Sequence, residues 1–319
     1  MQNKFSLTKR RFLQCIIFDK TKVSRLCRNL LQLASIKIMK KDNNKRFRIS
    51  LGSYNSKTKE KRNMKKMKLL MIGNSFSEDT SSYASQIAAK MGLTLDICNM
   101  YIGGCTIDTH LSKIKSNEPA YDMQLCHDGK WSFNPGSTFD DGLLRDEYDV
   151  ITLQQASGYS GIPSSYDGYL EELLAYVKGK SRNKNAEYWW HLTWAYSVGS
   201  PHCDFPKYGS NQSKMYQAIL SCYQSKVRPL GLEKIIPVGT AIQNARQIYV
   251  ESKLSRDLFH LSYDFGRFLA SLTLVESLFG VDPAPYNLSC PTGEEDERLA
   301  KLIVKKAIEN PLSISKINQ

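Results

Sequence analysis

From Lys68 onward, short apolar runs alternate with helix-length segments whose apolar residues recur at helical spacing. Such alternation favours a parallel sheet with helices on both faces. Strands are predicted at 68–72, 95–100, 149–153, 188–195 and 234–238. Helices are predicted at about 81–91, 106–116, 166–179, 211–226, 262–279 and 295–308. The pattern therefore predicts an α/β fold: a three-layer α/β/α sandwich around a five-stranded parallel sheet of flavodoxin-like type, with right-handed connections.

The stretch 117–148 does not follow this rhythm. It is polar, contains Gly and Pro, and carries scattered aromatic residues, among them Trp131, Phe133 and Phe139. Long irregular segments in compact domains are often functional. We therefore expect an insertion at about 117–148 that forms a loop or cap and shapes substrate access.

Charge is unevenly distributed along the 319 residues. The formal net charge is +13, but residues 1–66 hold 20 of the 44 Lys and Arg and only 3 of the 31 Asp and Glu, which leaves 24 basic and 28 acidic residues for 67–319. The basic, polar composition of 1–66 predicts a disordered extension or a mis-started leader ahead of one folded domain at 67–319. An arm that binds nucleic acid or a membrane surface is the alternative. No nucleic-acid partner is expected for the net negative domain.

The N-terminal region shows no convincing targeting signal. The apolar run Phe12–Phe18 is short and no small-residue cleavage site follows it. No segment reaches the roughly 18 uninterrupted apolar residues of a membrane span. Met64 and Met67 stand just before the first predicted strand, and translation from either would favour a cytoplasmic location, which otherwise stays open.

Cysteines are scattered along the chain, at positions 15, 27, 98, 105, 126, 203, 222 and 290. None forms a Cys-x-x-Cys pair, so neither a zinc site nor a redox motif is indicated. Free thiols in a reducing compartment are the simplest interpretation, with disulfides left open.

Candidate chemistry gathers where predicted strands end, which is where ligands bind in an open α/β sheet. Ser75, within Gly73–Ser77, follows the first strand and precedes a helix. Gly73 permits a tight turn there, and the backbone N–H of Ser75 would lie near a helix N-terminus. A nucleophile suits this place, although a lone serine after a strand is more often a helix cap.

Two further strand ends carry groups that suit a developing oxyanion. The glycines in Tyr101–Thr106 let backbone N–H groups approach a reacting oxygen. Gln154 and Gln155 directly follow the strand that ends at Leu153, and a side-chain amide is a good neutral donor. A structural turn and polar capping of the strand are the respective alternatives.

Asp257 and His260 stand just before the amphipathic stretch 262–279. An acid three residues before a histidine on a turn can bond the imidazole and fix its tautomer, which frees the other nitrogen to take a proton from serine. Two polar residues that cap the helix are the alternative.

The remaining histidines and aromatic residues have simpler interpretations. His191 lies in an apolar strand and is expected to be a satisfied core residue, that is, a buried histidine whose ring nitrogens have hydrogen-bond partners. Three others have no acidic partner at an informative spacing: His110, His127 and His202. One group of aromatic residues could line a sugar-binding face, although core packing is favoured: Trp190, Trp194 and Tyr196.

Taken together, these pieces resemble the SGNH-hydrolase (GDSL-like esterase) superfamily, and in particular a poorly characterised bacterial branch of it. The resemblance extends from about Lys68 to Pro283. Its blocks are Gly73-Asn-Ser-Phe-Ser77, Ile102-Gly-Gly-Cys-Thr106 and Asp257-Leu-Phe-His260, together with Leu192–Tyr196 and Pro237–Ala241. Asn74 stands where many members have Asp. Ala156 stands where the third block usually supplies an Asn, which by inference moves that donor role to Gln154 or Gln155.

The resemblance implies a serine esterase that hydrolyses a carboxylic ester through an acyl-enzyme. Its implied catalytic residues are the nucleophile Ser75, the base His260 and the orienting acid Asp257. Its implied oxyanion donors are the N–H groups of Ser75 and Gly104 and the amide of Gln154 or Gln155. The triad requires no metal and no organic cofactor.

Deacetylation of a carbohydrate is the leading expectation for the substrate, because the superfamily includes many carbohydrate esterases and the strand-end loops are polar and aromatic. A lipase or thioesterase is the alternative, favoured if 117–148 forms an apolar lid. A non-catalytic ligand-binding protein on the same fold is another, with Asn74 and Ala156 in its favour and the intact Ser/Asp/His set against it.

Overall fold

A computed structural model describes residues 66–318. The predictions made for the basic leader therefore lie outside the described residues. The first strand begins at Lys66, two residues before the predicted start.

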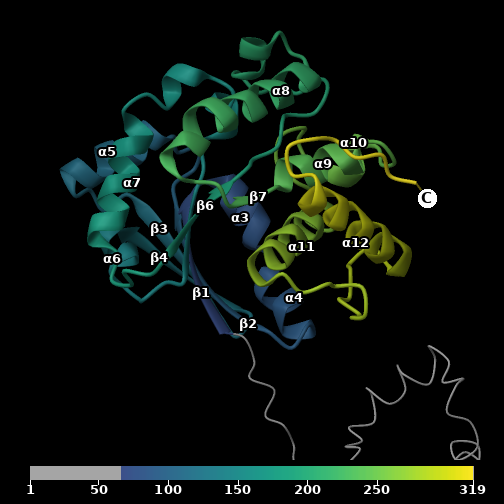
Figure 1. The fold of residues 1–319 in the computed structure, drawn as a ribbon, viewed down its shortest axis with the longest axis horizontal. Coiled ribbons are helices and arrows are strands. Elements are labelled where there is room, and N and C mark those ends of the chain that lie inside the picture. The colour runs from purple at the N-terminus through teal and green to yellow at the C-terminus, as the bar shows by residue number, and fades with distance from the viewer. Residues whose placement is uncertain (1–65, 319) are drawn as a thin grey trace, which may run out of the picture. The chain divides into compact units, whose positions relative to one another are not determined.

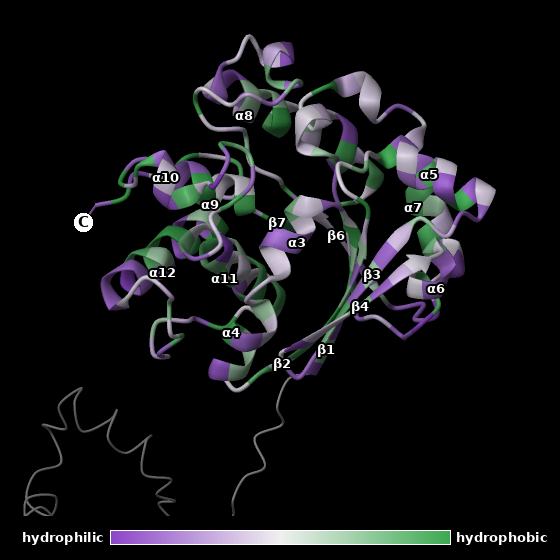
Figure 2. Cartoon of the chain, turned by 180° about the vertical axis from the view of Figure 1, so that it is seen from behind, coloured by the Kyte–Doolittle hydropathy of each residue, from purple (hydrophilic) through white to green (hydrophobic). Residues whose placement is uncertain are grey.

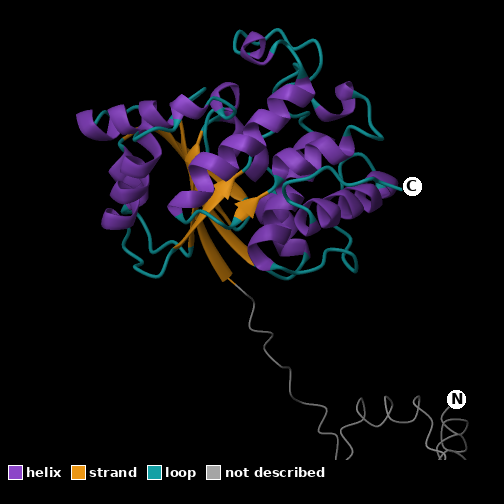
Figure 3. Cartoon of the chain, turned by 45° about the horizontal axis from the view of Figure 1, so that its top comes forward, coloured by secondary structure: helices purple, strands orange, loops and turns teal. Residues whose placement is uncertain are grey.

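Between residues 66 and 318 seven strands form one mixed sheet in the order β4-β3-β2-β1-β5-β6-β7. Figure 3 shows the strands in orange among the helices. The strands are β1 (Lys66–Gly73), β2 (Thr94–Tyr101), β3 (Tyr121–His127), β4 (Lys130–Ser137), β5 (Val150–Leu153), β6 (Glu187–His191) and β7 (Ile235–Ile236). β1 pairs in parallel with β2 and β5, β5 with β6, and β6 with β7. These five are the predicted strands, and their order is the flavodoxin-like order 2-1-3-4-5.

The prediction of a sheet with five strands only was wrong, because β3 and β4 extend it at one edge. They form an antiparallel hairpin, and β3 pairs antiparallel with β2. The hairpin falls within 117–148, so the expectation of an irregular loop or cap there was also wrong. Asp128 and Gly129 make the two-residue connection with φ of 48° and 74°, the left-handed conformation that tight hairpin turns require.

Helices cover both faces of the sheet (Figure 1). On one side lie α5 (Ile107–Ser116), α6 (Phe139–Leu143) and α7 (Tyr169–Lys180). On the other lie α3 (Ser75–Ser81), α4 (Ala84–Lys90), α9 (Val238–Ala245), α11 (Phe265–Phe279) and α12 (Glu294–Glu309). Two more helices are α8 (Gln212–Cys222) and α10 (Glu251–Leu254). The α/β fold and its layered arrangement are as predicted.

The core lies between the sheet and these two helical layers (Figure 2). β5 is buried along its whole length, and Leu69–Ile72 of β1 are at most 1% exposed. Near-continuous apolar runs are typical of parallel strands that are covered on both faces. β1 and β5 therefore give a rigid base for the turns that follow them.

No helix in the described part of the chain combines the length and apolar character needed to cross a membrane. Within residues 66–318 the cysteines are free thiols: Cys98, Cys105, Cys126, Cys203, Cys222 and Cys290.

Candidate active site

Ser75 is the first residue of α3, directly after β1. Gly73 is required at this turn, because a Cβ there would lie 2.5 Å from Ser77 Oγ and 2.9 Å from Gln154 Cδ. Asn74 caps the helix, and its Oδ1 accepts the N–H of Phe76 at 3.0 Å. The turn therefore presents the Ser75 hydroxyl at the end of the strand, beside the N-terminus of α3.

His260 lies between Ser75 and Asp257. Its Nε2 is 2.9 Å from Ser75 Oγ, and its Nδ1 is 2.7 Å from Asp257 Oδ2. Because a carboxylate only accepts, the proton on a neutral imidazole belongs on Nδ1, which leaves Nε2 to accept the serine proton. The three residues, 185 positions apart in sequence at the widest, thus form a continuous hydrogen-bonded chain.

A tight turn carries both the acid and the histidine. A bridge between Ser255 and Leu261 closes it, and Leu258 at its tip has a φ of 70°. Such a conformation is unusual for a branched residue and tends to occur at functional sites. Asp257 Oδ1 accepts the backbone N–H groups of Phe259 and His260 at 3.1 and 2.6 Å. The carboxylate thereby fixes the turn as well as the imidazole.

The acid of this turn is held in its charged form. Burial raises the pKa of Asp257, but the hydrogen bond from the His260 side chain and the two backbone donors outweigh it and lower the pKa below its ordinary value. A carboxylate that accepts several N–H groups behaves in this way. Asp257 therefore stays ionised at neutral pH and can stabilise an imidazolium.

Asp79, one turn after Ser75 on α3, ties the helix to that same turn through a buried charge. Its side chain is fully buried and pairs with Arg256 at 3.0 Å and with Arg267 at 2.7 Å. Its Oδ2 also accepts the N–H of Leu261 at 2.9 Å, next to His260. We call Asp79, Arg256 and Arg267 the charged network. It fixes the distance between the serine and the histidine.

The loop that follows β2 brings Gly104 into the wall of the cleft that also contains Ser75. Gly104 has a φ of 64°, which glycine adopts without strain. Asn74 holds this loop, because its Nδ2 donates to the carbonyl of Cys105 at 3.0 Å. Among the described residues neither the N–H of Ser75 nor that of Gly104 donates to a protein acceptor. Both are free for a ligand.

A second set of buried side chains holds Asn74 in turn. Thr80 Oγ1 lies 3.1 Å from His191 Nε2, His191 Nδ1 lies 2.7 Å from Gln154 Oε1, and Gln154 Nε2 donates to Asn74 Oδ1 at 2.8 Å. All four are at most 4% exposed. Burial lowers the pKa of His191 to about 3, so its ring is neutral. We call Thr80, His191, Gln154 and Asn74 the neutral network.

The glutamine amides do not point at the serine. Gln154 is part of the neutral network, and Gln155 donates to Ser165 while its Oε1 accepts the N–H of Ile107. Neither lines the cleft around Ser75, where Ala156 lies instead. The structure thus brings together the predicted residues Ser75, Asp257, His260 and Gly104. It places both glutamines behind them.

The cleft at Ser75 measures about 210 Å³. Its lining is polar and aromatic: Asn74, Ser75, Phe76, Gly104, Ala156, Ser157, Gly158, Tyr159, Tyr196, His202, Asp204, Phe259 and His260. No residue of 117–148 is among them, so the expected role of that segment in substrate access is not seen. Of the aromatic residues singled out in the sequence, Trp190 and Trp194 are buried, and Tyr196 reaches the cleft wall.

Trp194 packs against the residues that follow Ser75 and precede His260 in the sequence. Its ring stacks on Phe76 at 3.9 Å, and its indole N–H donates to the carbonyl of Phe259 at 2.8 Å. The preference for core packing is therefore confirmed for Trp194, and the packed ring steadies the residues on either side of the triad.

Sequence reasoning missed Asp79, His202 and Asp204. Asp79 lies four residues after Ser75, on the same face of the helix, and this spacing was a usable signal. His202 and Asp204 follow the end of β6, the same edge of the sheet as the other strand-end groups. His191 was expected to be a satisfied core residue, and its two hydrogen bonds confirm this.

In the described residues one cluster of three side chains is of the kinds that can bind a metal ion: His202, Cys203 and Asp204. Their ligand atoms lie within 4.8 Å of one another. His202 Nδ1 already accepts the N–H of Asp204, and Asp204 Oδ1 pairs with Lys207 at 2.7 Å. Cys203 is exposed. Because His202 Nδ1 and Asp204 Oδ1 already have partners, the cluster is poorly suited to bind a metal ion.

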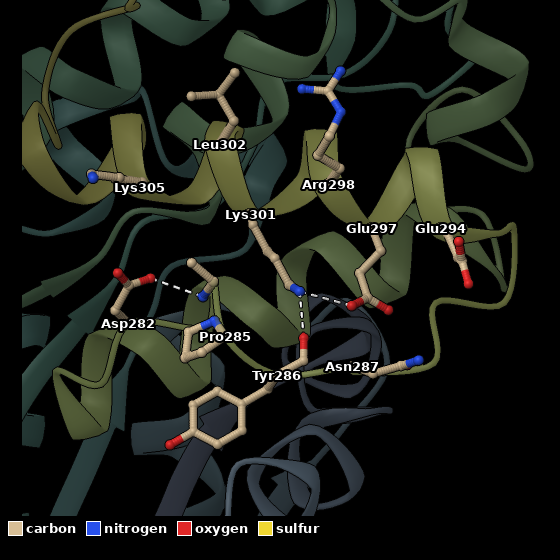
Figure 4. A pocket seen from close by; sticks show the side chains of 11 residues that line it. Asp282, Pro285, Tyr286, Asn287, Glu294, Glu297, Arg298, Lys301, Leu302 and Lys305 are labelled. Atoms are coloured by element: carbon tan, nitrogen blue, oxygen red, sulfur yellow. Dashed lines mark hydrogen bonds and ion pairs between the residues drawn. The ribbon is translucent and has the colours of Figure 1, made fainter. Parts of the chain in front are cut away.

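A separate hollow of about 530 Å³ lies beside α12 (Figure 4). Lys301 spans it and bonds Glu297 and the carbonyl of Tyr286. Charges of both signs face it and neutralise one another, and it contains none of the triad residues. The chemistry therefore belongs to the smaller cleft.

Comparison with known proteins gives a family. A model described as "Domain of unknown function (DUF4886)" matches residues 68–302. The crystal structure of a DUF4886 family protein from Bacteroides uniformis ATCC 8492 has a TM-score of 0.73 and 34% identity, and covers 79% of this chain and 98% of its own. No curated protein matches the chain.

Two more solved structures are less similar. A protein from Slackia heliotrinireducens, described as a putative SGNH hydrolase, has a TM-score of 0.46 and 19% identity, and covers 66% of this chain and 98% of its own. Axe2, an acetylxylan esterase from Geobacillus stearothermophilus, has a TM-score of 0.42 and 10% identity, and covers 70% and 97%. Similarity at this level does not bear on the chemistry of this chain.

Proposed function

Starting from the fact that the chain belongs to the DUF4886 family, we propose that it is a serine esterase of the SGNH type that hydrolyses a carboxylic ester through an acyl-enzyme. The observation that carries this proposal is the hydrogen-bonded chain from Ser75 through His260 to Asp257, with distances of 2.9 and 2.7 Å. A nucleophile, a base and an orienting acid in this order are the requirements of acyl transfer.

In the proposed reaction Ser75 Oγ attacks the ester carbonyl while His260 Nε2 takes its proton. Asp257 stabilises the imidazolium that forms. His260 then gives the proton to the oxygen of the leaving alcohol, and the acyl group remains on Ser75. Water, activated by the same imidazole, releases the acid and restores the serine.

The oxyanion would lie between the free N–H groups of Ser75 and Gly104. Each donor of this kind typically lowers the activation barrier by about 2.7–4 kcal/mol. Gln154 would act indirectly, because its amide holds Asn74 and Asn74 holds the Gly104–Cys105 segment. This replaces the direct role expected from the sequence for a glutamine amide.

The cleft favours a short acyl group on a polar alcohol. Its volume of about 210 Å³ leaves little room for a long chain, and its wall combines aromatic rings with polar side chains. We therefore propose an acetyl ester of a carbohydrate as the substrate. The absence of 117–148 from the cleft lining removes the apolar lid that would have favoured a lipase or thioesterase.

Release of p-nitrophenol from p-nitrophenyl acetate tests this proposal. Wild type should turn the ester over, and Ser75→Ala should lose roughly 10³-fold or more in kcat. Ser112→Ala, an exposed serine on α5, is the matched control and should keep the wild-type rate. Equal rates for wild type and Ser75→Ala would refute the nucleophile assignment. Longer p-nitrophenyl esters should react more slowly as the acyl chain outgrows the cleft.

A further inference from the structure

Three residues of the cleft wall have no part in the proposed hydrolysis: His202, Asp204 and Tyr159. Phe259 lines the same cleft, and its ring is 4.9 Å from that of His202 and 4.3 Å from that of His260. His260 must deliver its proton to the departing oxygen. We therefore expect groups close to His260 to meet the leaving alcohol.

His202 offers a hydrogen-bond donor at this place. Its ring is held between Tyr196, at 4.6 Å, and Phe259. Its Nδ1 accepts the N–H of Asp204 at 3.2 Å, so the proton of the neutral ring belongs on Nε2. Burial lowers the pKa of His202, which favours this neutral form. Within residues 66–318 no protein group accepts from Nε2.

Asp204 offers an acceptor that lines the same cleft as that donor. Lys207 fixes its Oδ1 at 2.7 Å, and its Oδ2 lies 3.7 Å from His202 Nδ1. The carboxylate packs against Gly158, where a Cβ would come within 2.3 Å of Oδ2. Any side chain at that position would displace the carboxylate. The glycine thus allows the acceptor to form part of the cleft wall.

A hydroxyl is the neutral group that can both accept from an imidazole N–H and donate to a carboxylate. An ether or an alkyl group leaves Asp204 Oδ2 without a hydrogen-bond donor, since Lys207 pairs with Oδ1, and a polar atom left unpaired by the ligand discriminates against that ligand. Tyr159, which is 36% exposed, adds an aromatic surface to the same wall.

We propose that His202 and Asp204 form a subsite for a free hydroxyl of the leaving alcohol, so that the enzyme selects esters of polyols or sugars with a hydroxyl next to the ester. This inference rests on the esterase activity proposed for Ser75. In this proposal His202 and Asp204 select the alcohol part of the ester, and other residues of the cleft bind the acyl group.

A matched pair of acetates tests the subsite: trans-2-hydroxycyclohexyl acetate and cyclohexyl acetate, which differ in one hydroxyl. Wild type should prefer the hydroxy ester by roughly tenfold or more in kcat/KM. His202→Phe keeps a flat ring against Tyr196 and Phe259 but has no donor, and it should bring the ratio of the two esters close to one. Asp204→Asn should lower the ratio as well.

Cys203→Ser, between the two subsite residues, is the control and should keep the wild-type ratio. Melting temperatures identify a variant that does not fold. If one of the two subsite variants does not fold, the ratio measured in the other one tests the subsite. A wild-type ratio near one, or a ratio unchanged in both subsite variants while p-nitrophenyl acetate is still hydrolysed, would overturn the subsite and leave the esterase proposal intact. A wild type inactive on all three acetates would overturn both.

Discussion

Two polar networks begin at neighbouring residues of α3 and hold different parts of the site by different means. Asp79 leads to two arginines and to the turn that carries His260. Thr80 leads through neutral side chains to Asn74 and the Gly104 loop. One side is held by charge and the other by uncharged hydrogen bonds.

The difference matches what each side must do. The imidazole becomes positively charged during acyl transfer, and the charged network keeps its turn at a fixed distance from Ser75. The Gly104 side must receive a negative oxygen, and a neutral network brings no fixed charge close to it. An unpaired buried charge costs more than an unpaired neutral group. The two networks should therefore fail differently when they are broken.

The largest effect is expected from Asp79→Asn. The change leaves two arginines around a neutral amide, and breaking a buried ion pair typically costs about 3–5 kcal/mol. Urea unfolding should show a loss in this range, and kcat should fall roughly tenfold because the His260 turn loses its anchor. Asp108→Asn, at an exposed position on α5, should change the free energy of unfolding by less than about 0.5 kcal/mol. A similarly small change for Asp79→Asn would remove the distinction between the networks.

Acid should weaken the neutral network. The pKa of His191 is about 3 in the folded protein, against an ordinary value of 6.5. The unfolded chain therefore binds more protons between these values, so the stability contributed by the neutral ring is full above pH 6.5 and is lost as the pH falls towards 3. Between pH 7.5 and pH 4.5 the loss should be about 2–3 kcal/mol.

His191→Gln tests this pH dependence, because glutamine can still bond Thr80 and Gln154 but does not titrate. The fall in unfolding free energy from pH 7.5 to pH 4.5 should shrink by about 2–3 kcal/mol in this variant. His127→Gln, which replaces an exposed histidine, should leave the fall unchanged. An identical pH profile for wild type and His191→Gln would contradict a neutral buried ring.

Gln154→Ala should affect turnover more than its stability cost suggests. It removes the partner of Asn74 and of His191, at a cost of about 1–3 kcal/mol, and loosens the Gly104 loop, so kcat should fall roughly tenfold. Gln155→Ala, at an equally buried neighbouring position, breaks the bonds to Ser165 and Ile107 and serves as the comparison. Its stability should drop similarly with a smaller loss of kcat. A larger loss of kcat in Gln155→Ala than in Gln154→Ala would show that Gln155, and not Gln154, positions the oxyanion donors.

The smallest effect is expected at the exposed edge of the charged network. Tyr263 is 64% exposed, and its ring lies 4.6 Å from the Arg256 guanidinium and 4.8 Å from that of Arg267. Tyr263→Leu should lower the free energy of unfolding by about 0.5–1 kcal/mol, as expected for exposed cation–π contacts. A loss above about 2 kcal/mol in urea unfolding would show that the ring belongs to the network core.

Much of the fold followed from the alternation of apolar runs and amphipathic segments, because buried parallel strands leave that pattern. The hairpin of β3 and β4 was missed because its Gly and Pro and its exposed outer strand resemble a loop. The dipeptide Asp128-Gly129 was the available signal, since it is a typical two-residue hairpin turn.

At the site, the place of Ser75 at a strand end and the spacing of Asp257 and His260 before a helix were enough to select these three residues, and the family resemblance singled out Gly104. The side-chain directions of Gln154 and Gln155 were not predictable. They depend on His191 and Ser165, which come from distant parts of the chain and become neighbours only in the folded sheet. The ion pair of Asp79 with Arg256 was not predictable either, because these two residues also come from distant parts of the chain.

The central claim is that His260 activates Ser75. Intact-mass spectrometry after incubation with a fluorophosphonate tests it most directly, because the reagent bonds covalently to an activated serine. We expect one adduct per wild-type chain, located on Ser75 by peptide mapping, a strongly slowed reaction in His260→Ala, and no adduct in Ser75→Ala. A wild type that stays unlabelled, or labelling that persists in Ser75→Ala, would contradict the account.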